Sequence, residues 1–271
     1  MNNEINKYQP NNRMSELIRD DYRLLQVISR FGIPLGFGDK SVQEICQNNM
    51  VDCYTFLAVA NFMQEENEQI HHDVGTLSIP TMLNYLKRAH NYYLDFCLPT
   101  IRHKLTEAIS SLEEMEIVPL ILRFFDEYAH EVREHMEFED RHEFAYVSNL
   151  MTGNIEEAER ITLNACPMKM QQSKPSKTPL TTPTHVYHTG DNSNILLFTR
   201  QQALKHKQID SKLSELKNII IKYCPTRPDN YLLNAVLYDI FNCEKDLELH
   251  CRIEDCLFVP AVRLIEEKFG L

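Results

Sequence analysis

Glycine is scarce in this sequence and tryptophan is absent, with 7 Gly and 0 Trp among 271 residues. Glycine supplies the positive-φ positions that turn-rich β folds need, so its scarcity disfavours such folds. Long stretches also lack proline, which would interrupt a helix. The hydrophobic fraction of 43% and the charged fraction of 25% are ordinary for a globular protein. The sequence therefore predicts an all-α protein.

Long apolar runs and basic clusters are also missing. No run of about 18 apolar residues occurs, and the opening "MNNEINKYQPNN" lacks the apolar core of a signal peptide. The formal net charge is −11, and residues 14–66 contain no cluster of Lys and Arg. Such a balance argues against binding to nucleic acid or to an anionic membrane. We expect a cytoplasmic protein with neither partner.

The eight cysteines form no C-x-x-C pair and no zinc-finger spacing, so we expect free thiols in a reducing compartment. No P-loop, no G-x-G-x-x-G fingerprint and no Ser/Cys–His nucleophile arrangement is visible. Hydrolase and nucleotide-binding functions are therefore not indicated.

The hydrophobic pattern divides the chain into a small and a large helical unit. Residues 1–13 are predicted to be a disordered tail, residues 14–66 a small helical domain, and residues 67–80 a linker. Residues 81–271 are predicted to form the large unit. Within it, a stretch rich in Pro, Ser, Thr and Lys at about 164–195 has no apolar period and is interpreted as a flexible crossover.

In the small domain, "MSELIRDDYRLLQVISRF" has helical periodicity that places Leu17, Leu24, Leu25 and Ile28 near one face. Ser41 followed by Glu44 fits a capping box. In the large unit, the pattern predicts four long helices with a kink or break at Pro99, at about 81–109, 112–151, 199–223 and 229–268. Two short connections and one long crossover between such helices indicate a four-helix bundle.

One motif occurs twice, as "HMEFED" at 135–140 and "HCRIED" at 250–255. Residues i and i+4 lie on one face of a helix, about 6 Å apart at Cβ. His135 with Glu139, and His250 with Glu254, are therefore two candidate half-sites for metal.

Two further histidines complete the pattern. His90 precedes His135 by 45 residues and His206 precedes His250 by 44, with a predicted turn near the middle of each interval. Positions equidistant from the turn of an antiparallel hairpin lie side by side. The bundle would thus place four imidazoles and two carboxylates at one level.

In each helix these candidates continue the apolar stripe that faces the core. The stripes consist of Leu83, Leu86, Leu94, Cys97 and Ile101; Ile121, Phe124, Phe125, Tyr128 and Val132; Ala203, Ile209, Leu213, Leu216 and Ile220; and Leu232, Val236, Ile240, Cys243, Leu247 and Phe258. Buried ionisable groups without partners are costly, so six at one level indicate metal. Four His and two Glu suit two iron or manganese ions.

Other residues near the predicted site could also bind metal. His130 and Glu134 have the same spacing but lie five residues earlier, about 140° around the helix, so we interpret them as solvent-facing. Asp210 is four residues after His206. It is either a ligand or, by preference, a partner that orients the imidazole.

These residues carry a resemblance. The segments "YLKRAHNYYLDFCLP", "HMEFEDRHEF", "ALKHKQIDSKLSEL" and "HCRIEDCLFVPAV" resemble the hemerythrin-like di-iron domain. More closely, they are similar to the iron–sulfur cluster repair proteins of the RIC/ScdA type, the regulators of cell morphogenesis and nitric oxide signalling. The resemblance spans roughly residues 80–268 and implies an up-and-down hemerythrin-like bundle. It also implies two iron ions with oxo and carboxylate bridges, held by His90, His135, Glu139, His206, His250 and Glu254.

The implied function is repair of iron–sulfur proteins after oxidative or nitrosative damage, by iron donation or by reaction with O₂ or NO at the di-iron centre. Such a protein is more a repair or sensor protein than a turnover enzyme, and dimerisation is a family-level expectation. Two alternatives stay open: a regulator that senses O₂, NO or redox state through its N-terminal module, and a carrier of iron or oxygen. "VISRFGIPLGFGDKSVQEIC" resembles the family's small N-terminal domain but lacks its Cys-Cys pair, so thiol chemistry of that pair does not carry over.

Overall fold

The computed structural model describes residues 7–64, 73–110, 117–165, 194–224 and 230–271, with the backbone alone at 196–208 and 210. Its regular structure is helical in every one of these segments, which confirms the all-α prediction. Within them the only β pairing is an isolated bridge between Arg13 and Ser41. None of the helices described has the length and apolarity needed to cross a membrane.

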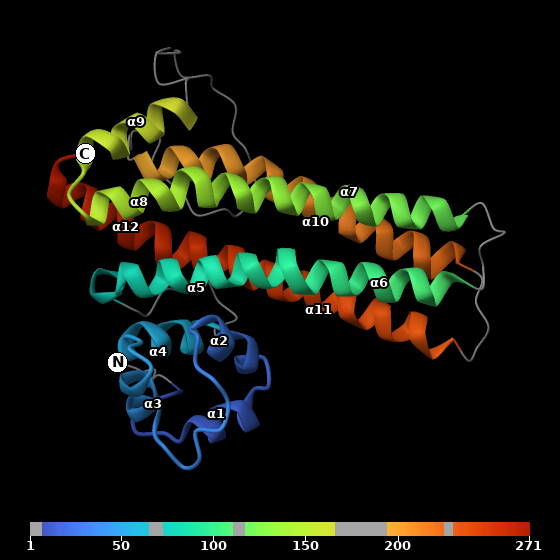
Figure 1. The fold of residues 1–271 in the computed structure, drawn as a ribbon, viewed down its shortest axis with the longest axis horizontal. Coiled ribbons are helices and arrows are strands. Elements are labelled where there is room, and N and C mark those ends of the chain that lie inside the picture. Colours follow the sequence, from blue (N-terminus) through green and yellow to red (C-terminus); the bar gives the residue numbers. More distant parts are fainter. Residues whose placement is uncertain (1–6, 65–72, 111–116, 166–193, 225–229) are drawn as a thin grey trace, which may run out of the picture.

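Four long helical rods lie side by side along the molecule (Figure 1). The first joins α5 (Ile79–Asn91), η2 (Tyr92–Cys97) and α6 (Leu98–Ile109); the second joins α7 (Ile117–Phe138), η4 (Glu139–Glu143) and α8 (Phe144–Met151); the third is α10 (Asn194–Tyr223); the fourth joins α11 (Tyr231–Ile253), η6 (Glu254–Phe258) and α12 (Val259–Phe269). The first rod packs along the fourth, and the second along the third. These rods correspond to the four predicted helices.

Helix α9 (Ile155–Ala165) was not predicted and packs against α8. The crossover predicted at 164–195 falls mainly on residues 166–193, which lie outside the described part of the chain. At its edges the structure differs from the prediction, because Ala165 still belongs to α9 and Asn194 already begins α10.

Three of the rods contain one π-helical turn, namely η2, η4 and η6. Pro99 and Pro260 each follow such a turn by two residues. Proline has no N–H to give to the carbonyl four residues earlier, and a π turn is one way to accommodate that loss. The expected break at Pro99 is therefore a π turn within a continuous rod.

The small domain contains α1 (Met14–Asp20), α2 (Leu24–Arg30), α3 (Val42–Asn48) and α4 (Cys53–Phe62). The capping box of Ser41 and Glu44 at the start of α3 is confirmed. The stretch "MSELIRDDYRLLQVISRF", whose periodicity placed four apolar residues near one face, is divided between α1 and α2. As a result Leu25 is 40% exposed rather than on the buried face.

Part of the predicted tail is packed, since Tyr8 is buried and exchanges backbone hydrogen bonds with the Asn61 side chain at 2.8 and 3.1 Å. The prediction of disorder was thus wrong for residues 7–13, and residues 1–6 lie outside the described chain. The prediction rested on the polar composition of this stretch and did not consider that Tyr8 could pack into the core. Within the predicted linker, residues 73–80 contain a 3₁₀ turn, η1 (Val74–Thr76), and the start of α5.

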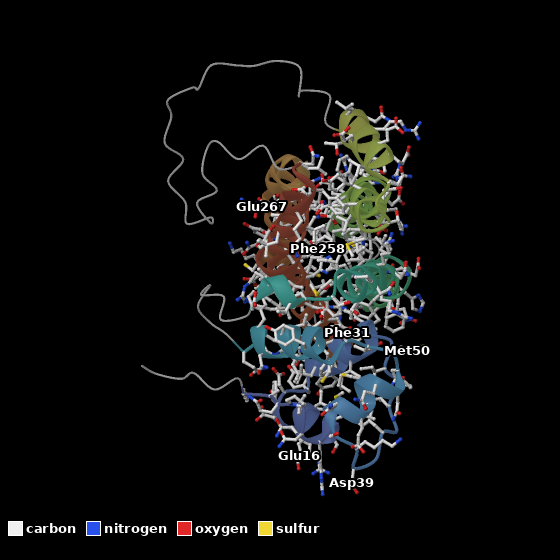
Figure 2. All side chains as sticks on the ribbon, turned by 90° about the vertical axis from the view of Figure 1, so that its left-hand side faces the viewer. Glu16, Phe31, Asp39, Met50, Phe258 and Glu267 are labelled. Atoms are coloured by element: carbon white, nitrogen blue, oxygen red, sulfur yellow. The ribbon has the colours of Figure 1, made fainter. Side chains whose placement is uncertain are left out.

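The small domain sits against α5 and α11 (Figure 1). At the junction Phe31 packs on Tyr85 of α5, with ring centroids 4.7 Å apart. Figure 2 labels Phe31 where the small domain meets the rods. Arg30 makes a two-pronged ion pair with Asp246 of α11, at 2.9 and 2.5 Å. Arg30 is 2% exposed, so this pair is largely removed from water.

The buried apolar residues that the structure describes form two clusters. One joins the small domain to one end of the rods and includes Leu86, Phe144 and Phe258. The other fills the opposite half of the rods and includes Tyr93 and Val132. The charged residues of the candidate site lie at the level where one cluster gives way to the other.

Candidate metal centre

Five of the six predicted ligands meet in one buried layer across three rods. His90 comes from α5, His135 and Glu139 from the α7–η4 junction, and His250 and Glu254 from the α11–η6 junction. All five are at most 6% exposed. The layer was predicted from helical spacing, and the packing of the rods brings its members together.

His90, His250 and Glu254 form a cluster that could hold a metal ion. The Nε2 atoms of the two histidines are 3.2 Å apart, and Oε1 of Glu254 lies 3.4 Å from Nε2 of His250 and 3.9 Å from Nε2 of His90. Ligands about 2.1 Å from one ion are about 3.0 to 3.9 Å from each other at angles of 90° to 135°. The three separations fall in that range.

Glu139 stands between two histidines. Its Oε2 atom is 3.5 Å from Nε2 of His90, and its Oε1 atom is 3.3 Å from Nε2 of His135. One carboxylate thus turns its two oxygens toward two different imidazoles, which is how a carboxylate between two adjacent ions is disposed.

The electrostatics of the layer are unfavourable to bare carboxylates. Burial, followed by repulsion from Glu254, raises the pKa of Glu139 well above its usual value. Burial, followed by repulsion from Glu143, does the same to the pKa of Glu254. Among the described residues, none donates a hydrogen bond to Oε2 of Glu139 or Oε1 of Glu254. A cation would compensate both, so the donor set fits a metal.

The backbone also changes form at this level. Glu139 and Glu254 each begin a π turn, and their carbonyls accept the i+5 bonds from Phe144 and Val259. Single π turns within α-helices are frequent at functional sites. In both rods, the extra residue is inserted where the carboxylate enters the core.

Asp140 is a functional candidate that we did not predict. Its Oδ1 atom lies 3.1 Å from Nδ1 of His90, on the edge of the ring opposite the cluster. Carboxylates in this position orient metal-binding histidines. The signal was present in the sequence, because both copies of the motif end in Glu-Asp and Asp255 is the counterpart of Asp140.

Glu143 was also missed. It is 5% exposed and lies four residues after Glu139, on the same face. Burial and the nearby charge of Asp255 raise its pKa to about 8. It adds a third buried carboxyl beside the layer, and its i+4 spacing from Glu139 was the available signal.

The remaining predicted residues divide into two groups. His206 and Asp210 belong to α10, but their side chains lie outside the described part of the structure, so their roles stay predictions. His130 and Glu134 are exposed, which confirms that this second pair faces solvent.

Comparisons with known protein families and with curated proteins found no match for this sequence. Within the structure, the buried layer is the feature that indicates chemistry. His90, His250 and Glu254 could hold one ion, and Glu139 connects that position to His135.

Proposed function

We propose that this protein is a non-haem di-iron protein that repairs iron–sulfur clusters damaged by oxidative or nitrosative stress. The main support for a two-metal site is the position of Glu139, with one oxygen toward His90 and the other toward His135. The repair part rests on the resemblance of the ligand segments to the RIC/ScdA type.

In this proposal the iron ions would be held by His90, His250 and Glu254 and by Glu139 and His135, with His206 as the sixth predicted ligand. Bound iron would supply the redox chemistry with O₂ or NO, and labile iron for donation. The chain contributes orientation through Asp140 and exclusion of water through the apolar clusters on both sides of the layer. A nitrogen- and oxygen-rich donor set favours iron or manganese over a structural zinc.

The first test is the iron content of protein purified without oxygen. We expect about two irons per chain in the wild type and a large loss in His250→Ala. His130→Ala is the matched control, because it removes an exposed histidine with the same i+4 glutamate and should leave the iron unchanged. Equal iron in wild type and His250→Ala would refute the site.

The repair function needs its own measurement. The iron-loaded protein is incubated with an enzyme whose iron–sulfur cluster has been damaged by peroxide, and recovery of that enzyme's activity is followed. We expect recovery with the wild type, and none with His250→Ala or with an equal amount of free ferrous iron. Normal iron binding without recovery of the enzyme's activity would support the di-iron centre but contradict the repair function.

A specific contact favours sensing as the second candidate. The Arg30 guanidinium of the small domain lies 5.0 Å from the ring centroid of Tyr93, and that ring lies 5.8 Å from the ring of His250. Tyr93 thus lies between Arg30 of the small domain and His250 of the candidate metal layer. Hydrogen exchange in α1–α4 that changes with the oxidation state of the iron would support a sensor.

A further inference from the structure

Three rings in contact lead from the candidate metal layer toward the surface, and we call them the aromatic series: His250, Tyr93 and Tyr92. The ring centroids of His250 and Tyr93 are 5.8 Å apart, and those of Tyr93 and Tyr92 are 5.5 Å apart. Tyr93 is 1% exposed, whereas Tyr92 is partly exposed. The series thus begins at a candidate ligand and ends at solvent.

The outer end of the aromatic series borders two cavities between the small domain and the rods. One has a volume of about 570 Å³ and the other about 320 Å³, and both have Gln26 and Tyr92 in their walls. The Gln26 amide of α2 donates a hydrogen bond to the Tyr92 hydroxyl, with Nε2 and Oη 3.3 Å apart. None of the five described ligands of the layer lines either cavity. Tyr92 is therefore the member of the series from which a proton can pass to water.

The charges beside the two tyrosine rings are balanced. The guanidinium carbon of Arg30 lies 5.3 Å from the ring centroid of Tyr92 and 5.0 Å from that of Tyr93. A lone cation at this distance would oppose the loss of an electron from either ring, because the oxidised ring becomes more positive. Asp246 pairs with Arg30 at 2.9 and 2.5 Å, so the two charges largely cancel. The ion pair therefore removes most of this obstacle to oxidation.

We propose that Tyr92 is a redox-active tyrosine, which supplies one electron to the metal layer through Tyr93 and becomes a neutral tyrosyl radical. This inference rests on the proposed function, because it needs iron in the layer. The co-reactant is a hydroperoxide, which takes up two electrons when its O–O bond breaks. Tyr92 supplies the second electron when only one ferrous ion is present to supply the first.

The atoms and electrons balance for one molecule of hydrogen peroxide. One ferrous ion is oxidised to ferric, and Tyr92 loses one electron and its phenolic proton. The peroxide takes up these two electrons and two protons, one equivalent to the proton from Tyr92 and one from solvent, and becomes two waters. Tyr93 gives an electron to the layer and receives one from Tyr92, so it is unchanged at the end. A hydrogen-atom donor of the ascorbate type restores Tyr92 and is itself oxidised by one electron.

The position of each hydroxyl decides which ring keeps the radical. A phenol that loses an electron becomes strongly acidic, so it persists as a neutral radical only where its proton can leave. The Tyr93 hydroxyl is shielded from water, whereas Tyr92 lines both cavities. Tyr93 is therefore the intermediate of the electron transfer, and Tyr92 is its end point.

The protein contains a matched control tyrosine. Tyr85 of α5 is as buried as Tyr93, and its hydroxyl is also shielded from water. Among the described residues, its ring packs on Phe31 and on no member of the aromatic series. A general tendency of buried tyrosines near the layer to be oxidised would include Tyr85, whereas the proposal excludes it.

The test uses the full-length protein, prepared without oxygen and loaded with one ferrous ion per chain. One equivalent of hydrogen peroxide is added, samples are frozen at successive times, and electron paramagnetic resonance spectra are recorded. We expect a tyrosyl radical whose hyperfine splitting changes when the tyrosines carry ring deuterium. The radical yield should fall several-fold in Tyr92→Phe and in Tyr93→Phe, and should be unchanged in Tyr85→Phe.

Bound iron and peroxide consumption are measured on the same samples, so that the two proposals can fail separately. An absence of bound iron overturns the proposed function and this inference together. Bound iron and consumed peroxide without a tyrosyl radical, or equal losses in Tyr92→Phe and Tyr85→Phe, overturn only the role of Tyr92. Should a variant fail to fold, peptide mapping of the peroxide-treated wild type decides: we expect oxidation at Tyr92, and oxidation at Tyr85 in its place would overturn the inference.

Discussion

His90 is held on its outer edge by Asp140, with Nδ1 and Oδ1 3.1 Å apart, while its Nε2 faces His250 at 3.2 Å. An ionised carboxylate only accepts hydrogen bonds, so this contact favours the tautomer with the ring proton on Nδ1. Nε2 is then left with a free lone pair directed into the cluster. The contact thus orients the ring and favours the tautomer that a metal ligand needs.

Removal of this contact should weaken metal binding without unfolding the protein. For Asp140→Ala we expect a loss of about 10- to 100-fold in metal affinity, measured by competition with a chelator of known affinity. Asp126→Ala is the control, since Asp126 pairs with Arg102 on the surface. An unchanged affinity in Asp140→Ala would show that the rods alone orient His90.

Glu143 should make the metal-free protein less stable as the pH rises. Its pKa is raised from 4.5 to about 8, so between these values the folded state holds a proton that the unfolded state has lost. The contribution of Glu143 to the stability of the folded state is therefore greatest below about pH 4.5 and falls as the pH rises toward about 8.

We expect Glu143→Gln to remove this dependence and to stabilise the metal-free protein at pH 7 by roughly 1–3 kcal/mol, since one pKa unit corresponds to about 1.4 kcal/mol. Urea unfolding at pH 5, 6, 7 and 8 measures it. Parallel curves for the variant and the wild type would contradict the assignment.

The Arg30–Asp246 pair should hold the small domain on the rods. For Arg30→Met we expect a loss of about 2–4 kcal/mol in the free energy of unfolding, because Asp246 is left without its partner in a poorly solvated position. The double variant Arg30→Met/Asp246→Leu should recover much of this loss.

Arg123→Met is the control for the pair, because Arg123 and Glu127 form an exposed i,i+4 ion pair. Such pairs contribute about 0.3–0.5 kcal/mol. A loss in Arg30→Met no larger than in Arg123→Met would mean that apolar contacts such as Phe31 on Tyr85 hold the junction alone.

Asp21 should stabilise the small domain through its charge. Burial raises the pKa of this carboxyl, but hydrogen bonds from Arg23 and Gln64 outweigh that effect, and the pKa is lowered to about 2. The stabilisation is present above about pH 4 and is lost as the pH falls toward 2.

We expect Asp21→Asn to cost about 1–2 kcal/mol at pH 7, after allowance for partial solvent screening. The difference between Asp21→Asn and wild type in thermal unfolding should disappear near pH 2. A difference that is constant over this range would assign the effect to packing instead of charge.

The repeated motif was sufficient to predict four of the five residues that the structure brings together. Helical spacing is a local property, so His135 with Glu139 and His250 with Glu254 could be placed on one face from the sequence alone. The count of residues to each turn added His90. The apolar stripes likewise identified most of the core. Two named residues differ: Leu232 is 39% exposed while Leu233 at 4% is buried instead, and Phe124 is only partly buried. The side chain of Ala203 lies outside the described part of the structure.

Contacts between rods could not be predicted in the same way. The sequence does not state that Nε2 of His90 faces His250 or that Asp140 reaches across to His90. These depend on the rotation of one helix against another, which is decided by the packing of many side chains at once. The π turns, which rotate every later residue of a rod, are a further source of such contacts.

By itself, then, the sequence determined the helical class, the apolar stripes of the rods and the chemistry of the candidate ligands, because these follow from composition and from the period of one helix. Only the tertiary structure decided which donors share an ion-sized space, which carboxyls lose their water, and where the small domain docks. Each of these is a property of distances between segments far apart in the chain, and no local pattern encodes such distances.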